Sequence, residues 1–162
     1  MARKTHATED LRQKAYLALV RVLRQSYNPA PLMSGGVLYI APGPTFMENA
    51  IRNAIIKFEQ EFMGRGPDDV RAFIVRDLVV VRLKGVLTPA ERQLAKTVEG
   101  VDMVKRLRQN LIAQGRDKLT EQVSEITGAK VIGVFTDIDV QLGERVFVFT
   151  MDREPQHNGR AK

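Results

Sequence analysis

The sequence predicts an α+β fold: a two-layer domain in which a four-stranded, mostly antiparallel sheet carries helices on one face, preceded by an accessory helix. Three observations support this fold class. Apolar residues recur at helical spacing in some segments and at strand spacing in others, two capping boxes mark helix starts, and residues 45–152 read helix–strand–strand–helix–helix–strand–strand. The 162 residues, 44% of them hydrophobic, suffice for one domain with short additions.

The first 44 residues are predicted to lie outside this domain. Residues 1–27 contain an amphipathic helix that begins after Thr8, because apolar positions recur every three or four residues among basic ones. Residues 28–44 are rich in Pro and Gly, which break helices and favour turns, so this segment is predicted to be a linker. At the other end, the polar residues 153–162 are predicted to form a disordered tail.

The first helix of the domain is predicted to begin at a capping box, in which the Thr45 hydroxyl and the Glu48 carboxylate each accept a backbone N–H. Its apolar stripe stops at Gly64, and glycine commonly ends helices. Two β-branched segments joined by a two-residue turn then predict a hairpin with strands 70–75 and 78–83.

The second half of the domain begins with another capping box, Thr88 to Glu91, with Pro at the first helical position. Helical periodicity follows, and then two alternating apolar segments around a turn. These signals predict, in order, a short helix up to about Thr97, a long helix over roughly 101–127, and strands 131–138 and 144–151.

The last strand is predicted to be apolar on both faces, because Val146 and Val148 alternate with Phe147 and Phe149. The helices cover one of these faces. The other needs a second cover, which the N-terminal helix or a second subunit would provide. We favour the second subunit and expect a homodimer.

The net charge of the chain lies in its ends. Lys and Arg number 25 against 19 Asp and Glu, a formal charge of +6, but residues 45–152 hold equal numbers of both signs. A nucleic-acid-binding module usually carries a basic stripe on its folded core, so this distribution does not favour nucleic acid as the partner. The sequence shows neither an apolar run of the ~18 residues that a membrane span needs nor a secretory h-region, which predicts a cytoplasmic protein.

Residues that could carry chemistry are few. The absence of Cys excludes thiol nucleophiles, zinc–cysteine sites and iron–sulfur clusters. His6 and His157 lie in the predicted ends, and none of the three Ser residues lies in a nucleophile elbow. The segment 64–66 (GRG) lacks the remainder of a phosphate-binding loop. We therefore expect a protein that is not an enzyme, with no catalytic residue, cofactor or metal.

One pair of carboxylates is the candidate for a metal or ligand site. Asp137 and Asp139 form an Asp-x-Asp pair that could hold Mg²⁺ on one side of a strand, with Asp152 approaching across the hairpin. Hydrogen bonds to the neighbouring turn, or an ion pair with Arg145 opposite, are the plainer interpretation.

Basic side chains form the candidate interaction surface. Arg76, Arg82 and Lys84 recur at even spacing and would share one strand face, close in sequence to Arg65, where they could bind an anion or an acidic partner. The basic residues of the N-terminal helix complete the set: Arg12, Lys14, Arg21 and Arg24.

Three segments resemble the MpsC-like family, a small bacterial domain family. They are residues 64–67 (GRGP), residues 79–91 (VVVRLKGVLTPAE) and residues 136–149, and the resemblance extends over about 46–152. The family is named after a cation-translocating, membrane-potential-generating system that is also linked to inorganic-carbon uptake. The resemblance implies an accessory or regulatory interaction protein, associated with membrane transport subunits or with the inner face of the membrane, and it supplies no catalytic residues.

Two other classes of function remain open. The element order is similar to that of type II KH domains, which bind single-stranded RNA through a Gly-x-x-Gly loop between paired helices. Residues 98–102 (VEGVD) offer one Gly and two acids at the expected junction, and acids repel phosphate. The other alternative is a small-ligand or metal-dependent enzyme that uses Asp137 and Asp139.

Overall fold

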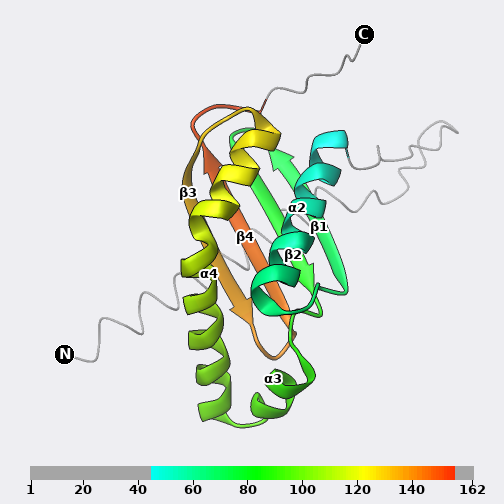
Figure 1. Cartoon of the computed structure of the whole chain (residues 1–162), viewed down its shortest axis with the longest axis vertical. Helices are drawn as coiled ribbons and strands as arrows, with labels where there is room; N and C mark the ends of the chain where they lie inside the picture. The colour runs from blue at the N-terminus through cyan, green and yellow to red at the C-terminus, as the bar shows by residue number, and fades with distance from the viewer. Residues whose placement is uncertain (1–44, 156–162) are drawn as a thin grey trace, which may run out of the picture. The chain divides into compact units, whose positions relative to one another are not determined.

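A computed structural model describes residues 45–155 of the chain (Figure 1). The predicted accessory helix in residues 1–27, the linker 28–44 and the end of the tail lie outside the described residues. The elements are, in order, α2 (Phe46–Met63), β1 (Asp69–Val75), β2 (Leu78–Lys84), α3 (Pro89–Leu94), α4 (Val98–Thr127), β3 (Val131–Asp139) and β4 (Glu144–Met151). This order is the predicted one.

The four strands form one antiparallel sheet in the order β1-β2-β4-β3, so that β1 and β3 are its edges. Figure 1 shows α2 and α4 lying side by side on one face of this sheet, with α2 nearer β1 and α4 nearer β3. The predicted two-layer α+β architecture is therefore confirmed. The short helix α3 lies at the end of the sheet where β2 ends.

The predicted capping boxes set the starts of α2 and α3. At α2, the Thr45 N–H donates to Glu48 Oε2 over 2.7 Å, and the Glu48 N–H donates to Thr45 Oγ1 over 3.2 Å. Thr88 and Glu91 repeat this geometry at α3. At the other end of α2, Gly64 adopts the left-handed conformation with φ 75°, as its position after the apolar stripe predicted.

Helix α4 begins three residues earlier than the sequence indicated. The Thr97 hydroxyl oxygen accepts the Gly100 N–H over 3.0 Å, and this cap starts the helix at Val98. A Cβ at Gly100 would lie 1.8 Å from the Leu94 carbonyl oxygen. Glycine at this position therefore lets the end of α3 pack directly on the first turn of α4.

The core lies between the helices and the sheet. Val79, Val81 and Leu83 of β2 and Phe147 and Phe149 of β4 face the helices and are buried. They pack against a helical layer that includes Ile51, Ile55, Phe58, Val104, Leu119 and Val123.

The two long helices approach each other closely at Gly115 of α4. A Cβ there would lie 2.6 Å from the nearest ring atom of Phe58 and 2.9 Å from Phe62, both on α2. The two rings stack on each other with their centroids 4.6 Å apart. Gly115 is weak as a helix former, but its missing side chain is the space that these rings occupy.

The opposite face of the sheet also carries apolar residues, as the alternation in β4 predicted. Val80 and Val146 lie on this face and are buried, and Val148 is half-buried. The predicted cover by a second subunit or by the N-terminal helix stays a prediction.

Candidate functional site

Four charged side chains, three of them buried, meet between the helical layer and the sheet, and each comes from a different element. Glu59 lies on α2, Glu91 on α3, Arg108 on α4 and Arg145 on β4. We call this set the buried ion network. Arg108 is fully buried and Glu59 and Arg145 nearly so, while Glu91 lies at the margin. The spacing along each element places the two arginines on its buried side. Arg108 lies four residues from Val104 and from Ile112 on the same helix face, and Arg145 lies two residues from Phe147 on the same strand face.

The strongest contact in the network joins Arg108 to Glu91. Arg108 Nε and Nη2 each donate to one oxygen of the Glu91 carboxylate over 2.8 Å, a bidentate pair. Arg108 Nη2 also donates to the Val86 carbonyl oxygen, just after β2. One guanidinium thus ties α4 to α3 and to the end of the sheet.

Glu59 is held more loosely between the two guanidinium groups. Its Oε2 lies 3.6 Å from Arg108 Nη1, and its Oε1 lies 4.0 Å from Arg145 Nη1. Neither contact is a hydrogen bond, and Glu59 Oε1, Arg108 Nη1, Arg145 Nε and Arg145 Nη1 are buried without a hydrogen-bond partner. The Arg145 guanidinium lies 5.6 Å from the centre of the Phe147 ring, which adds a cation–π contact.

Burial and pairing shift the pKa values of this network in opposite directions. Burial raises the pKa of the Glu59 carboxyl, and the nearby Arg145 and Arg108 only partly offset this. Burial alone would also raise the pKa of Glu91, but hydrogen bonds from Arg108 and the Thr88 N–H lower it below the ordinary value. Burial lowers the pKa of Arg145 to about 10, with Glu59 opposing the shift.

The network has two positive and two negative groups, and its best-formed contact is the bidentate pair between Arg108 and Glu91. The pairing of Arg108 with Glu91 and Val86 joins the helical layer to the sheet. Removal of one member of such a buried pair leaves an uncompensated charge, which costs about 3–5 kcal/mol. Loss of any one member of the network would therefore destabilise this packing of α2, α3 and α4.

The sequence-predicted basic residues are largely engaged in internal contacts. Arg82 makes a bidentate pair with Glu144, with distances of 2.7–3.0 Å, and Lys84 Nζ lies 3.9 Å from the same carboxylate. Arg65 binds Asp68 over 2.7 Å and also donates to the Leu87 carbonyl oxygen.

Of the three basic residues predicted to share one strand face, only two do so in the structure. Arg82 and Lys84 share the sheet face away from the helices, whereas Arg76 lies in the turn between β1 and β2 with φ 56°. The basic residues of the predicted N-terminal helix lie outside the described residues. Whether the basic set forms an interaction surface stays a prediction.

The structure gives Asp137 and Asp139 local roles at the mouth of the last hairpin. Asp137 Oδ1 accepts the Ile138 N–H over 2.8 Å, and Asp139 Oδ1 accepts the Leu142 N–H over 3.0 Å. Among residues 45–155, no group of three or more His, Cys, Asp or Glu side chains is placed to hold a metal ion.

Two expectations about this pair are wrong, and the strand register explains both. Asp152 does not approach the pair, because it lies at the opposite end of the hairpin, where it accepts the Lys130 N–H over 2.8 Å. Arg145 does not pair with either aspartate, because it points to the helix side of the sheet and its ion pair is with Glu59.

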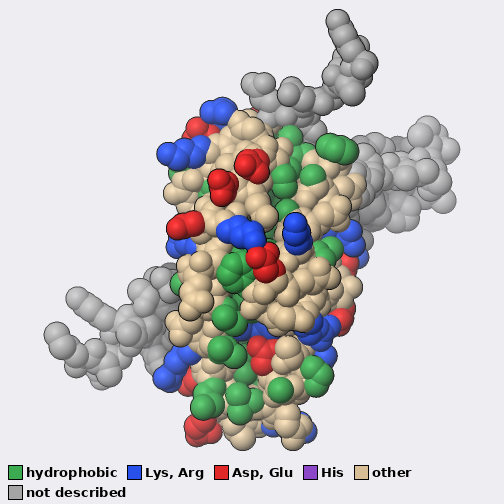
Figure 2. Space-filling model, in the orientation of Figure 1, with side chains coloured by type: hydrophobic (Ala, Val, Ile, Leu, Met, Phe, Trp, Pro, Cys, Tyr) green, Lys and Arg blue, Asp and Glu red, His purple; other side chains and the backbone are tan. Residues whose placement is uncertain are grey.

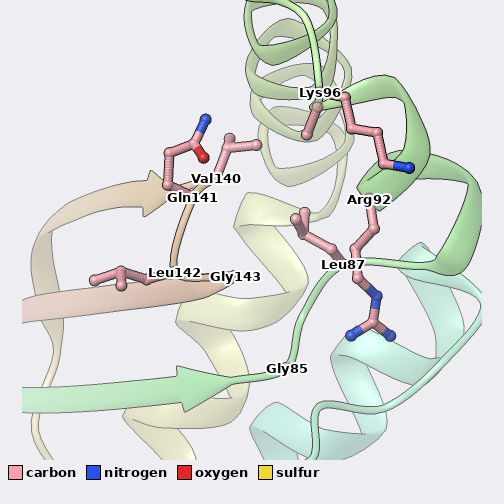
Figure 3. Close-up of a pocket in the computed structure, with 9 residues that line it drawn as sticks. Gly85, Leu87, Arg92, Lys96, Val140, Gln141, Leu142 and Gly143 are labelled. Atoms are coloured by element: carbon pink, nitrogen blue, oxygen red, sulfur yellow. The ribbon is translucent and has the colours of Figure 1, made fainter.

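A surface cavity of about 480 Å³ lies between α3, the segment after β2 and the β3–β4 turn (Figure 3). Arg92 and Lys96 are the charged residues that line it, which would favour an anion over a cation. Figure 3 shows their cationic groups pointing in different directions rather than towards one point. The cavity therefore lacks the convergent donors of a built anion site.

The helix-side surface mixes charges of both signs, and Figure 2 shows basic and acidic side chains interspersed over it. Apolar side chains gather towards the end where α3 meets α4. Large exposed apolar residues in this part of the chain are Leu94, Val98, Met103 and Leu107.

The junction between α3 and α4 differs from the loop that RNA-binding KH domains need. It consists of residues 95–97, without glycine, and the nearby Gly100 is buried in the first turn of α4 against the Leu94 carbonyl. That glycine serves helix packing rather than a close approach of backbone to phosphate. RNA binding stays an alternative hypothesis, which predicts a steep salt dependence of binding to single-stranded RNA.

Fold and site together define a small α+β domain whose buried charged residues pair with one another. Its sequence identifies the family. The chain belongs to the MpsC family: the family model described as "Na+-translocating membrane potential-generating system (MpsC)" matches residues 45–153. This confirms the resemblance found in the sequence.

Two relatives come from Bacillus subtilis (strain 168), and both are described as uncharacterized. The chain is 37% identical to YbcI over 112 residues, which cover 69% of this chain and 90% of YbcI. It is 36% identical to YrhF over 101 residues, which cover 62% of this chain and 83% of YrhF. No solved structure matches the chain significantly. In the described part of the chain, no helix is both long and apolar enough to span a bilayer.

Proposed function

We propose that this protein is a non-enzymatic accessory or regulatory subunit that binds a membrane-embedded, cation-translocating system from its cytoplasmic side. The observation that carries the proposal is the match of residues 45–153 to a family described by such a system. The system's transmembrane pathway belongs to other subunits, and this chain acts on them by contact.

The chemistry of the described residues supports a role in contact rather than in catalysis. The charged groups nearest the core pair with one another in the buried ion network, and Asp137 and Asp139 bind backbone N–H groups of their own hairpin. The exposed apolar residues near the junction of α3 and α4 offer a surface of the kind that protein partners cover.

Capture of membrane subunits tests the proposal. The full chain is immobilised and exposed to detergent-solubilised native membranes, and bound proteins are identified and quantified by mass spectrometry. We expect a cation-translocating integral membrane subunit in a fixed ratio to the chain. Recovery of no such subunit, in a preparation where the subunit is shown to be present, would contradict the proposal.

A pair of charge-reversal variants tests the contribution of the basic N-terminal residues. Reversal of Arg12, Lys14, Arg21 and Arg24 to Glu should weaken both the capture and the co-flotation with anionic liposomes, because basic segments are attracted to anionic lipid and to acidic loops. The matched control reverses four exposed basic residues of the domain that have no ion pair among the described residues: Lys57, Arg92, Arg106 and Arg116. An equal loss in both variants would show that the basic N-terminal residues make no specific contribution to binding.

A further inference from the structure

The two edges of the sheet differ in whether another element covers their backbone groups, and helix α2 covers the β1 edge. At the β1 edge, Arg52 Nε of α2 donates to the Val70 carbonyl oxygen over 3.1 Å, and Glu48 Oε1 of α2 accepts the Ile74 N–H over 3.2 Å. Helix α2 thus occupies backbone groups that would otherwise template a further strand. Covering an edge in this way prevents pairing with another chain.

The β3 edge has no comparable cover from the described residues. The Ile138 N–H turns away from β4 and is bound by the neighbouring Asp137 carboxylate. Because backbone groups alternate in direction along an antiparallel strand, those of Val134 and Thr136 point outward as well. No hydrogen bond joins these outward groups to a described residue outside the sheet.

Two large apolar side chains of this edge are exposed. Residues 131–136 (VIGVFT) contain no charge and no Pro, the two features that most often protect an edge strand. Phe135 is 67% exposed and Ile132 is 63% exposed. The register shift between Val131 and Gly133 leaves Ile132 irregular, so the regular part of the edge begins at Gly133.

The charges at the two ends of β3 indicate which strand fits this edge. Lys130 precedes the strand, and Asp137 and Asp139 lie near its other end. A second copy in antiparallel orientation places the carboxylates of each strand near the Lys130 of the other. A parallel copy would instead place like charges together, at a cost.

We propose that a second copy of this chain pairs with the β3 edge, antiparallel across a two-fold axis at Phe135, so that the two sheets become one eight-stranded sheet. Val134 of each copy exchanges backbone hydrogen bonds with Thr136 of the other. These two residues carry the outward backbone groups that lie between the register shift at Ile132 and the Ile138 N–H, which Asp137 already binds. The two Phe135 rings face each other directly. This inference concerns self-association and is independent of the proposed membrane partner.

A single cysteine tests this geometry, because the chain has no Cys of its own. The two copies of residue 135 form a non-hydrogen-bonded pair with Cα atoms about 4.5 Å apart, which is within the range of a disulfide. Mild oxidation of Phe135→Cys should therefore give a covalent dimer of twice the 18.2-kDa chain mass. Phe46→Cys, at a Phe that is 91% exposed on α2, is the control and should stay largely uncrosslinked. Equal crosslinking of the two variants would overturn the proposal.

Sedimentation of unmodified variants gives a second, independent test. The wild-type chain should sediment as a dimer, and Phe135→Lys should raise its dissociation constant at least about tenfold through loss of the aromatic pair and repulsion of two cations. Phe46→Lys should have no such effect. Circular dichroism checks that each variant is folded. A monomeric wild type, or a folded Phe135→Lys variant that dimerises as tightly as wild type, contradicts the proposal.

Discussion

Replacement of Arg108 by Met tests the buried ion network most sharply. The substitution keeps an apolar stem of similar length and removes the bidentate pair with Glu91 and the hydrogen bond to the Val86 carbonyl. It leaves Glu91 without its cation and the Val86 carbonyl unsatisfied. Breaking a buried pair in this way costs about 3–5 kcal/mol, a large part of the ~5–15 kcal/mol stability of a typical domain.

The matched control lies on the same helix. Lys118 of α4 pairs with Glu61 of α2 over 2.5 Å, but both side chains are almost half exposed. Solvent screens such a pair, so Lys118→Met should cost at most about 1 kcal/mol. The Arg108→Lys variant keeps the charge but not the planar fork, and its cost should lie between those of the two Met variants.

Urea unfolding of the full chain, followed by circular dichroism, measures these differences. With a slope of about 2 kcal/mol per molar urea, a loss of 4 kcal/mol lowers the midpoint by about 2 M. Because pairing lowers the pKa of Glu91, its contribution is fully present above pH 4.5 and is lost as the pH falls through the folded-state pKa. The difference in unfolding free energy between wild type and Arg108→Met should therefore become smaller below pH 4.5. Equal costs for Arg108→Met and Lys118→Met would refute the reasoning.

Three further predictions concern other parts of the domain. Burial raises the pKa of Glu59 above 4.5, so its ionisation lowers stability as the pH rises from 4.5 through the folded-state pKa. Glu59→Gln should thus gain stability relative to wild type over that interval in urea titrations, and a constant difference would show that the carboxyl is not perturbed. Gly115→Ala should lower the unfolding free energy by about 1–2 kcal/mol, because overpacking against Phe58 outweighs the better helix propensity of Ala; a more stable variant would show that the helices separate easily. Millimolar Mg²⁺ should leave the melting temperature of wild type and of an Asp137→Asn, Asp139→Asn double variant unchanged, whereas a ligand at 100 times its dissociation constant would add about 2.7 kcal/mol.

Most of the fold could be predicted from the sequence because its signals are local. The capping boxes at Thr45 and Thr88, the helix-ending Gly64 and the alternation in β4 each act within a few residues, and the structure confirms them. The start of α4 was harder to predict, because Gly100 reads locally as a helix breaker. Its role becomes clear only from the carbonyl of Leu94 that packs against it.

The buried ion network was not found from sequence, because its members are far apart along the chain. One signal was present: Arg108 interrupts the apolar stripe between Val104 and Ile112, and a charge there needs a buried partner. The partner could not be identified in the same way. Glu91 reads as a capping-box residue, a role that it also fills, and Arg145 reads as a partner of the aspartates in its own hairpin.

The most direct test of the functional proposal measures sodium-ion uptake into inverted membrane vesicles from cells that contain or lack this chain. If the chain is an accessory subunit of a sodium-translocating system, vesicles without it should take up less sodium and build a smaller potential, and adding the purified chain should restore both. Equal uptake and potential in the two preparations, unchanged by the added protein, would contradict the proposal.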